Sequence, residues 1–145
     1  MAGKKVDAAV DTVYSDGTQR EILLAIQKLA AERFRVLPSV REVRLEGSLS
    51  TGDFGISAAG FPDDINLVVF ADRIPREWRR AGVGRMWYSL YNFPDMPFFL
   101  YKGKEHALDL LVVARGKKQA AREAIRDSSG VIYLRKGEAG KYDHF

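Results

Sequence analysis

Three polar side chains stand inside otherwise apolar stretches of this chain, and their types suit metal-ion and phosphate chemistry. Asp64 and Asn66 open the segment DINLVVF, and Asp109 is the single charge in HALDLLVV. A carboxylate inside a buried strand is costly unless it is paired or meets a cation. Because residues two apart in a strand point to the same side, Asp64 and Asn66 are expected on one face of their strand.

A Gly47-Ser48 corner precedes these residues in the chain. Glycine permits a sharp turn and has no side chain to obstruct a ligand that approaches closely. Ser48 adds a hydroxyl and begins a segment whose backbone amides can face an anion. We therefore expect the corner to hold the phosphates of a nucleoside triphosphate. The alternative is an ordinary turn that caps a helix.

We expect the two strands to be neighbours, because a shared metal site reconciles two isolated acids in apolar surroundings. Mg²⁺ prefers oxygen ligands and usually takes one or two carboxylates together with substrate phosphates. The predicted ligands are Asp64, Asn66 and Asp109, with Asp64 and Asp109 as the catalytic pair. Asp109 would also receive the proton of an attacking hydroxyl. The alternatives are a structural salt bridge at Asp109, a solvent-exposed Asp64 and a hydrogen-bonding Asn66 without a metal role.

Hydrophobic periodicity predicts the elements that must position these residues. A helix begins at a Thr18–Glu21 capping box and ends near Phe34. The almost wholly apolar run 65–70 predicts a central strand that is covered on both faces. The other expected elements are a strand over 43–46 that ends at the Gly-Ser corner, a helix over 51–59, a hairpin of 98–101 and 106–113, a helix over 117–127 and a strand over 131–134.

Length and composition are those of one globular domain, spanning residues 1–145. Cysteine is absent, which excludes disulfides and thiolate metal sites. The chain has no run of about 18 apolar residues, and its N-terminus lacks the apolar core of a secretion signal. A cytoplasmic protein is therefore the expectation. The net charge of +4 and the pI near 9.4 favour anionic partners.

Basic and aromatic residues in two further regions allow more than one interpretation. The C-terminal helix and tail over 115–145 carry eight Lys or Arg against four Asp or Glu, which suggests RNA, nucleotide or an acidic protein surface as a partner. A solvated helix face is the alternative. Aromatic residues in the segment 78–93 either stack on bases or belong to the core. His106 and His144 are expected at the surface or at a sheet edge.

The order of the motifs resembles that of the polymerase-beta-type nucleotidyltransferase superfamily. Gly47-Ser48 comes first, Asp64-Ile65-Asn66-Leu67 follows after a spacer, and Leu108-Asp109-Leu110 comes last. The family signature is a Gly-Ser turn, then two acids that flank one apolar residue, then a third acid on a following strand. The match covers residues 40–113.

The resemblance implies an α+β fold in which a small mixed sheet packs against helices. It also implies Mg²⁺-dependent transfer of a nucleoside monophosphate from a nucleoside triphosphate to a hydroxyl acceptor. Small stand-alone members of the family look similar in size, and some of them pair with a separately encoded helical protein.

This sequence departs from the family pattern near the site. Asn66 stands where the family carries its second acid, and Leu49 stands where minimal members often have a basic residue. Asp63 is an extra acid, but it should point to the opposite side of a regular strand from Asp64. Loss of one acid from a set that acts as a unit lowers activity severely. Two hypotheses follow: a Mg²⁺-dependent nucleotidyltransferase, and a catalytically silent relative that binds nucleotide, RNA or a protein partner.

Overall fold

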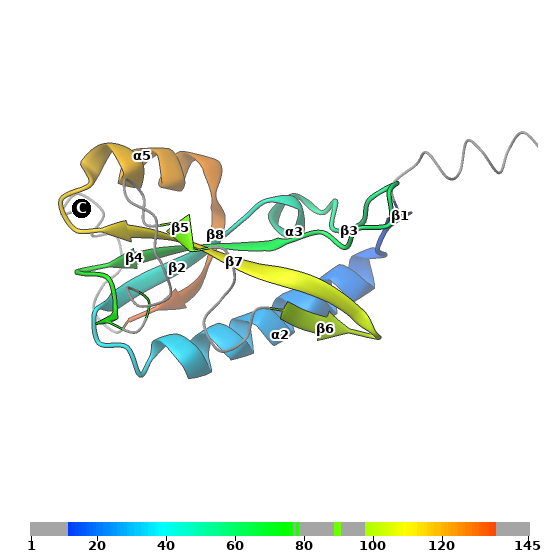
Figure 1. Cartoon of the computed structure of the whole chain (residues 1–145), viewed down its shortest axis with the longest axis horizontal. Coiled ribbons are helices and arrows are strands. Elements are labelled where there is room, and N and C mark those ends of the chain that lie inside the picture. The colour runs from blue at the N-terminus through cyan, green and yellow to red at the C-terminus, as the bar shows by residue number, and fades with distance from the viewer. Residues whose placement is uncertain (1–11, 77, 79–88, 91–97, 136–145) are drawn as a thin grey trace, which may run out of the picture.

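A computed structural model describes residues 12–76, 78, 89–90 and 98–135 of the chain. A sheet lies between helix α2 (Asp16–Phe34), which packs on one face, and helix α5 (Lys118–Asp127), which packs on the other (Figure 1). The larger of the two apolar clusters lies between the sheet and α2.

The sheet is mixed. Along it the strand order is β5 (Ser89–Leu90), β7 (Lys104–Ala114), β4 (Ile65–Ala71), β2 (Val40–Glu46) and β8 (Ser129–Leu134). β4 and β7 are parallel, and the other pairs in this order are antiparallel. The predicted α+β class, with a small mixed sheet packed against helices, is confirmed.

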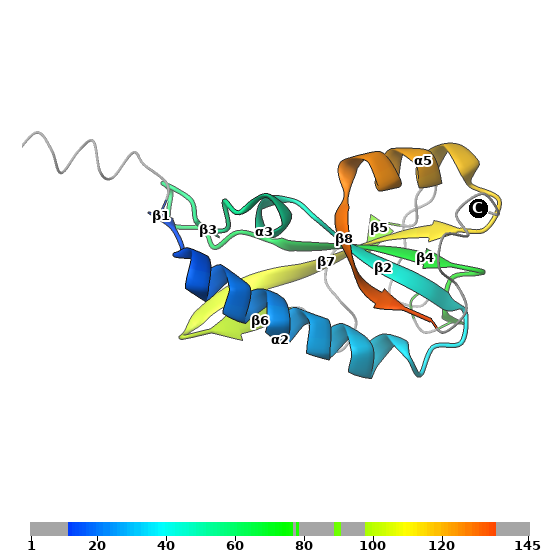
Figure 2. The ribbon, with the colours of Figure 1, turned by 180° about the vertical axis from the view of Figure 1, so that it is seen from behind.

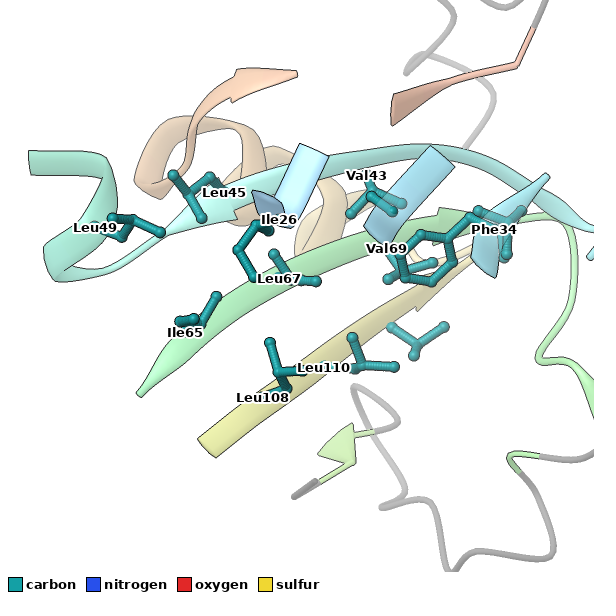
Figure 3. Packing of buried hydrophobic residues seen from close by; sticks show 14 of the residues in the cluster. Ile26, Phe34, Val43, Leu45, Leu49, Ile65, Leu67, Val69, Leu108 and Leu110 are labelled. Atoms are coloured by element: carbon teal, nitrogen blue, oxygen red, sulfur yellow. The ribbon is translucent and has the colours of Figure 1, made fainter. Parts of the chain in front are cut away.

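β4 is buried on both faces, because its side chains alternate between two different helices. Figure 3 shows the α2 side, where Ile65, Leu67 and Val69 of β4 pack toward Ile26 and Phe34. The other side holds the apolar cluster beneath α5: Val68, Phe70, Val113, Ala121 and Ala124. The predicted central strand with both faces covered is confirmed.

Helix α2 begins three residues earlier than the predicted capping box. Ser15 is the N-cap, and its hydroxyl oxygen accepts a hydrogen bond from the Thr18 amide at 3.2 Å. The capping prediction is wrong, because Ser15 takes the N-cap position and Thr18 lies inside the first turn of the helix. The helix ends at Phe34 as predicted. Neither α2 nor any other helix in the described ranges combines the length and apolar content that a membrane crossing needs.

The helix predicted over 51–59 is wrong. A short helix α3 (Ser48–Thr51) follows the Gly-Ser corner and stops at a glycine with a φ of +87°. Strand β3 (Gly55–Ile56) then pairs with β1 (Thr12–Val13). A Cβ added at Gly55 would lie 1.9 Å from a β1 carbonyl oxygen, so this pairing needs glycine there.

The predicted hairpin is present, with β6 (Phe98–Tyr101) paired to the first part of β7. Lys102 and Gly103 form its two-residue turn, with φ values of 47° and 81°. A turn with two positive φ values matches the right-handed twist of paired strands. The hairpin extends beyond α5 and runs along α2 (Figure 2). The predicted helix over 117–127 and strand over 131–134 are confirmed as α5 and β8.

Among the aromatic residues of the segment 78–93, the structure describes Trp78. This side chain is 3% exposed, and its ring meets Phe34 edge-on with 6.0 Å between centroids. The core interpretation is therefore confirmed for Trp78. The predictions for the following residues fall outside the described ranges: Trp87, Tyr88, Tyr91, Phe93 and His144.

Candidate functional site

A row of polar side chains crosses the sheet near the start of β4. Glu46 of β2 is in register with Asn66 of β4, and Asn66 is in register with Asp109 of β7. Residues that lie opposite one another on neighbouring strands project to the same face, so these three side chains share one face of the sheet. It is the face that α5 covers farther along the strands, opposite the α2 core.

Asp64 and Asp109 are brought together, as the sequence predicted. Asp64 immediately precedes β4 and shares the face of Asn66, whose partner on β7 is Asp109. The two carboxyl groups share a hydrogen bond. Burial, the charge of Asp64 and this hydrogen bond raise the pKa of Asp109 from 3.8 to about 6. Because two touching carboxylates repel when both are ionised, the pair favours a shared proton or a cation.

Gly47 brings the end of β2 against the same residues. Its φ of +86° lies in the left-handed region, which favours glycine. A Cβ added at this position would lie 2.7 Å from the Asn66 amide nitrogen, closer than real side chains approach. The Gly-Ser corner therefore packs directly on β4, and the amide nitrogen of Asn66 is the side-chain atom that faces it.

The Ser48 hydroxyl is hydrogen-bonded within the protein. It donates to Oδ2 of Asp63 at 3.2 Å, and the same oxygen accepts from the Gly55 amide at 2.9 Å. The Asp63 carboxylate therefore connects the Gly-Ser corner to β3 through hydrogen bonds. Its side chain does not join Asp64 and Asp109, in agreement with the expected strand alternation. A contact between Ser48 and a phosphate stays a prediction.

His106 is buried, so the expectation of a surface or edge position is wrong. Its side chain is 0% exposed, and its ring packs on Phe54 with 4.6 Å between centroids. Nδ1 lies 2.7 Å from the Asp63 carbonyl oxygen, and Nε2 lies 2.9 Å from the Tyr14 hydroxyl. Strand alternation was the signal that could have found it, because position 106 shares the core face of Leu108.

The donor set of this site suits a hard cation. Within the described ranges, no three Asp, Glu, His or Cys side chains lie close enough together to hold a metal ion. Asp64 and Asp109 nevertheless supply two carboxylates, and Asn66 adds an amide beside Asp109. Mg²⁺ usually takes one or two carboxylates and completes its coordination with waters and substrate phosphates. The residues present therefore fit Mg²⁺ carried by a triphosphate better than a metal site made by protein alone.

Glu46 borders the site, and the sequence interpretation missed it. Burial and the charge of Asp127 raise its pKa. Its register with Asn66 places it one strand away from that residue, on the side opposite Asp109. Its position directly before Gly47 was the available signal, but alternation with Leu45 fits a solvent-facing strand residue equally well.

A surface cavity of about 380 Å³ lies at the other end of β4. Its lining comes from the connection between α2 and β2 and from the segment after β4: Val36, Leu37, Pro38, Ser39, Arg73, Pro75 and Arg76. The seven residues of β4 span about 23 Å at the usual strand rise, so this cavity is remote from Asp64 and Asp109. None of the predicted site residues lines it.

The fold and the site together define a small α+β domain with a carboxylate pair where the parallel pairing of β4 with β7 begins. No protein-family model, curated protein or solved structure matched this chain. The family resemblance therefore depends on the order and spacing of the motif residues in the sequence.

Proposed function

We propose that this protein is a nucleotidyltransferase-like enzyme that transfers a nucleoside monophosphate from a nucleoside triphosphate to a hydroxyl acceptor, with Mg²⁺. The observation that carries the proposal is the contact between Asp64 and Asp109, whose strands lie far apart in the sequence. The Gly-Ser corner packs beside these acids through Asn66. A phosphate-binding turn beside a pair of metal-binding acids is the arrangement that phosphoryl transfer needs.

Each residue has a role in the proposed reaction. Asp64, Asn66 and Asp109 would hold Mg²⁺, which supplies positive charge that offsets the charge of the triphosphate and of the leaving group. The backbone at Gly47 and Ser48 would hold the phosphates. Glycine at position 47 lets the corner lie directly against Asn66, because a side chain there would collide with the Asn66 amide.

Asp109 suits the role of proton acceptor. The acceptor oxygen forms a bond to the α-phosphorus, the bond from that phosphorus to the bridging oxygen breaks, and pyrophosphate leaves. The hydroxyl proton passes to Asp109. In the metal-free protein the pKa of Asp109 is raised to about 6, so the carboxylate is ionised at neutral pH and more basic than an ordinary aspartate.

Calorimetric titration of the chain with Mg²⁺ and a non-hydrolysable nucleoside triphosphate tests the proposal. We expect triphosphate binding that requires the metal. Asn66→Asp adds the acid that the family carries, so it should tighten this binding and raise Mg²⁺-dependent transfer to a hydroxyl acceptor. Asn66→Ala is the matched control and should weaken the binding. If the wild-type chain does not bind triphosphate with Mg²⁺, and Asn66→Asp gains neither binding nor transfer, the enzyme proposal fails.

A second candidate function is a catalytically silent module that binds nucleotide, RNA or a protein partner. Asn66 in place of an acid favours it, as does the absence of a third acid close to Asp64 and Asp109 in the part of the chain that the structure describes. This candidate predicts triphosphate binding without transfer, both in the wild type and in Asn66→Asp. For RNA, it predicts an affinity that falls steeply with salt concentration.

A further inference from the structure

His106 lies on β7 three residues before Asp109, and its ring is enclosed by aromatic side chains. It is 0% exposed. The Phe54 ring lies 4.6 Å away between centroids, and the Tyr14 ring meets it edge-on at 5.6 Å. A polar ring in such surroundings is costly unless both nitrogens are hydrogen-bonded.

Both nitrogens have partners, and the partners determine where the proton resides. Nδ1 is 2.7 Å from the Asp63 carbonyl oxygen. A carbonyl can only accept, so Nδ1 carries the proton and donates it. When the ring carries this one proton, Nε2 is the acceptor of the Tyr14 hydroxyl, which lies 2.9 Å away. Burial, the charge of Asp63 and Tyr101 raise the pKa of Tyr14, so its hydroxyl retains the proton that it donates.

The hydrogen bond from His106 to Asp63 continues the pairing of β4 with β7. The parallel ladder begins where Ile65 pairs with Leu108, and the same register extended two residues back pairs Asp63 with His106. The His106 side chain thus supplies a hydrogen bond to Asp63 at a position just before the backbone hydrogen bonds between β4 and β7 begin. The Asp63 carbonyl and the Asp64 nitrogen belong to one planar peptide group. Holding this carbonyl therefore sets the direction in which the chain enters Asp64.

Asp63 is held at both of its ends. Its carbonyl meets His106, and its carboxylate accepts from the Gly55 amide at 2.9 Å and from Ser48 at 3.2 Å. The residue before Asp64 therefore has little freedom to rotate.

We propose that His106 is a positioning residue, which donates to the Asp63 carbonyl so that the Asp64 carboxyl group meets Asp109. The consequence for metal binding rests on the proposed function. Removing a residue that orients a metal ligand, without itself binding the metal, typically lowers metal affinity by about 10- to 100-fold. We expect loss of the His106 hydrogen bond to lower the affinity by a factor in that range.

Two substitutions of similar size separate the two hydrogen bonds of the ring. In His106→Asn the amide nitrogen is two bonds from Cβ, as Nδ1 is, so the donor to Asp63 is retained and the contact with Tyr14 is lost. In His106→Gln the amide is one bond farther out, as Nε2 is, so the contact with Tyr14 is retained and the donor to Asp63 is lost. A residue that only fills the core would show similar effects in both variants.

The measurements are calorimetric affinity for Mn²⁺ with a non-hydrolysable nucleoside triphosphate, and the metal-free crystal structure of each variant. We expect His106→Gln to bind about tenfold more weakly and to lose the contact between Asp64 and Asp109. We expect His106→Asn to keep the contact and to bind within about threefold of wild type. Ile26→Val, a mild change in the α2 core, serves as a control for lost stability and should leave binding unchanged.

The outcomes distinguish this inference from the proposed function. If His106→Gln keeps both the contact and the affinity, the inference is overturned. If even the wild type fails to bind Mn²⁺ and triphosphate while His106→Gln still loses the contact, the proposed function fails and the positioning role stands. Nitrogen-15 NMR of the wild-type ring requires no variant. We expect the proton on Nδ1, and a proton found on Nε2 instead overturns the inference.

Discussion

An aspartate lies near each end of β4, and the two differ in the sign of the charges around them. At the start of the strand, burial and the neighbouring Asp64 raise the pKa of Asp109 to about 6. Beyond its far end, Asp72 accepts hydrogen bonds from Nε of Arg41 at 2.7 Å and from Nε of Arg115 at 3.0 Å. Burial alone would raise the pKa of Asp72, but the two guanidinium groups outweigh it and lower that pKa.

The difference separates a stabilising carboxylate from one that destabilises the fold. Asp72 is stabilised when ionised in the folded state, because it forms ion pairs with Arg41 of β2 and with Arg115, which directly follows β7. Asp109 is disfavoured when ionised, since burial and a second acid oppose its charge. Carboxylates that the fold disfavours in their ionised form cluster at functional sites, where a bound ligand supplies the positive charge that the protein lacks. This contrast supports the placement of the site at the Asp64 end.

Asp109→Asn should have the largest effect and the clearest separation of binding from stability. Loss of one carboxylate of the pair should weaken Mg²⁺–triphosphate binding by about 100-fold or more, beyond the usual effect of residues that only support a ligand. The free energy of unfolding at pH 7 should rise by about 1 kcal/mol, allowing for solvent screening of a partly buried group. Calorimetry and urea unfolding measure the two quantities. Unchanged binding with reduced stability would instead identify Asp109 as a member of a structural ion pair.

Acidification should weaken metal–triphosphate binding, because the cation requires the ionised form of Asp109. With a pKa of about 6, affinity should fall about fivefold between pH 6 and pH 5. Stability changes in the opposite direction. The folded state holds this proton more tightly than the unfolded chain, so the contribution of Asp109 to stability is greatest below pH 4 and is lost as pH rises through 6. Asp72→Asn should show the wild-type binding profile, and a flat wild-type profile would contradict the assignment.

Gly47→Ala compared with Gly52→Ala tests the contact between the corner and β4. The two glycines have similar φ values, +86° and +87°, but their ψ values are −161° and +10°. Gly52 is therefore in the left-handed helical region, whereas Gly47 is in a region open essentially to glycine alone, so alanine is more strained at position 47. Only at position 47 does the new Cβ meet Asn66, at 2.7 Å, whereas Gly52 has nothing within 4 Å. Gly47→Ala should therefore be the less stable variant by about 1 kcal/mol and should bind several-fold more weakly. Equal losses of stability and of binding in the two variants would show that the Gly-Ser corner is not part of the binding site.

Asp72→Asn should have the smallest effect on binding, because the cluster at this end has its counter-charges within the chain. Its partly exposed ion pairs predict a loss of about 1 kcal/mol in the free energy of unfolding at pH 7. The lowered pKa means that this contribution is present above pH 4 and is lost on further acidification. Thermal unfolding checks the loss. A fall in metal–triphosphate affinity would show that the two ends are not independent.

Most of the fold could be predicted because its signals are local. The apolar run of β4, the hairpin turn at Lys102-Gly103 and the spacing in α5 each depend on neighbouring residues. The wrong prediction over 51–59 has a distant cause. Gly55 packs on the backbone of β1, more than forty residues earlier, and this pairing overrides a local pattern that also suited a helix.

The sequence by itself determined which side chains were available to the site and which strand face each would take. Only the tertiary structure decided that Asp64 touches Asp109, that Asp63 is held by Ser48 and that His106 is buried. The physical reason is the register between strands that lie far apart along the chain. Alternation within a strand follows from local backbone geometry, but a shift of one residue between β4 and β7 would point either acid away from the other.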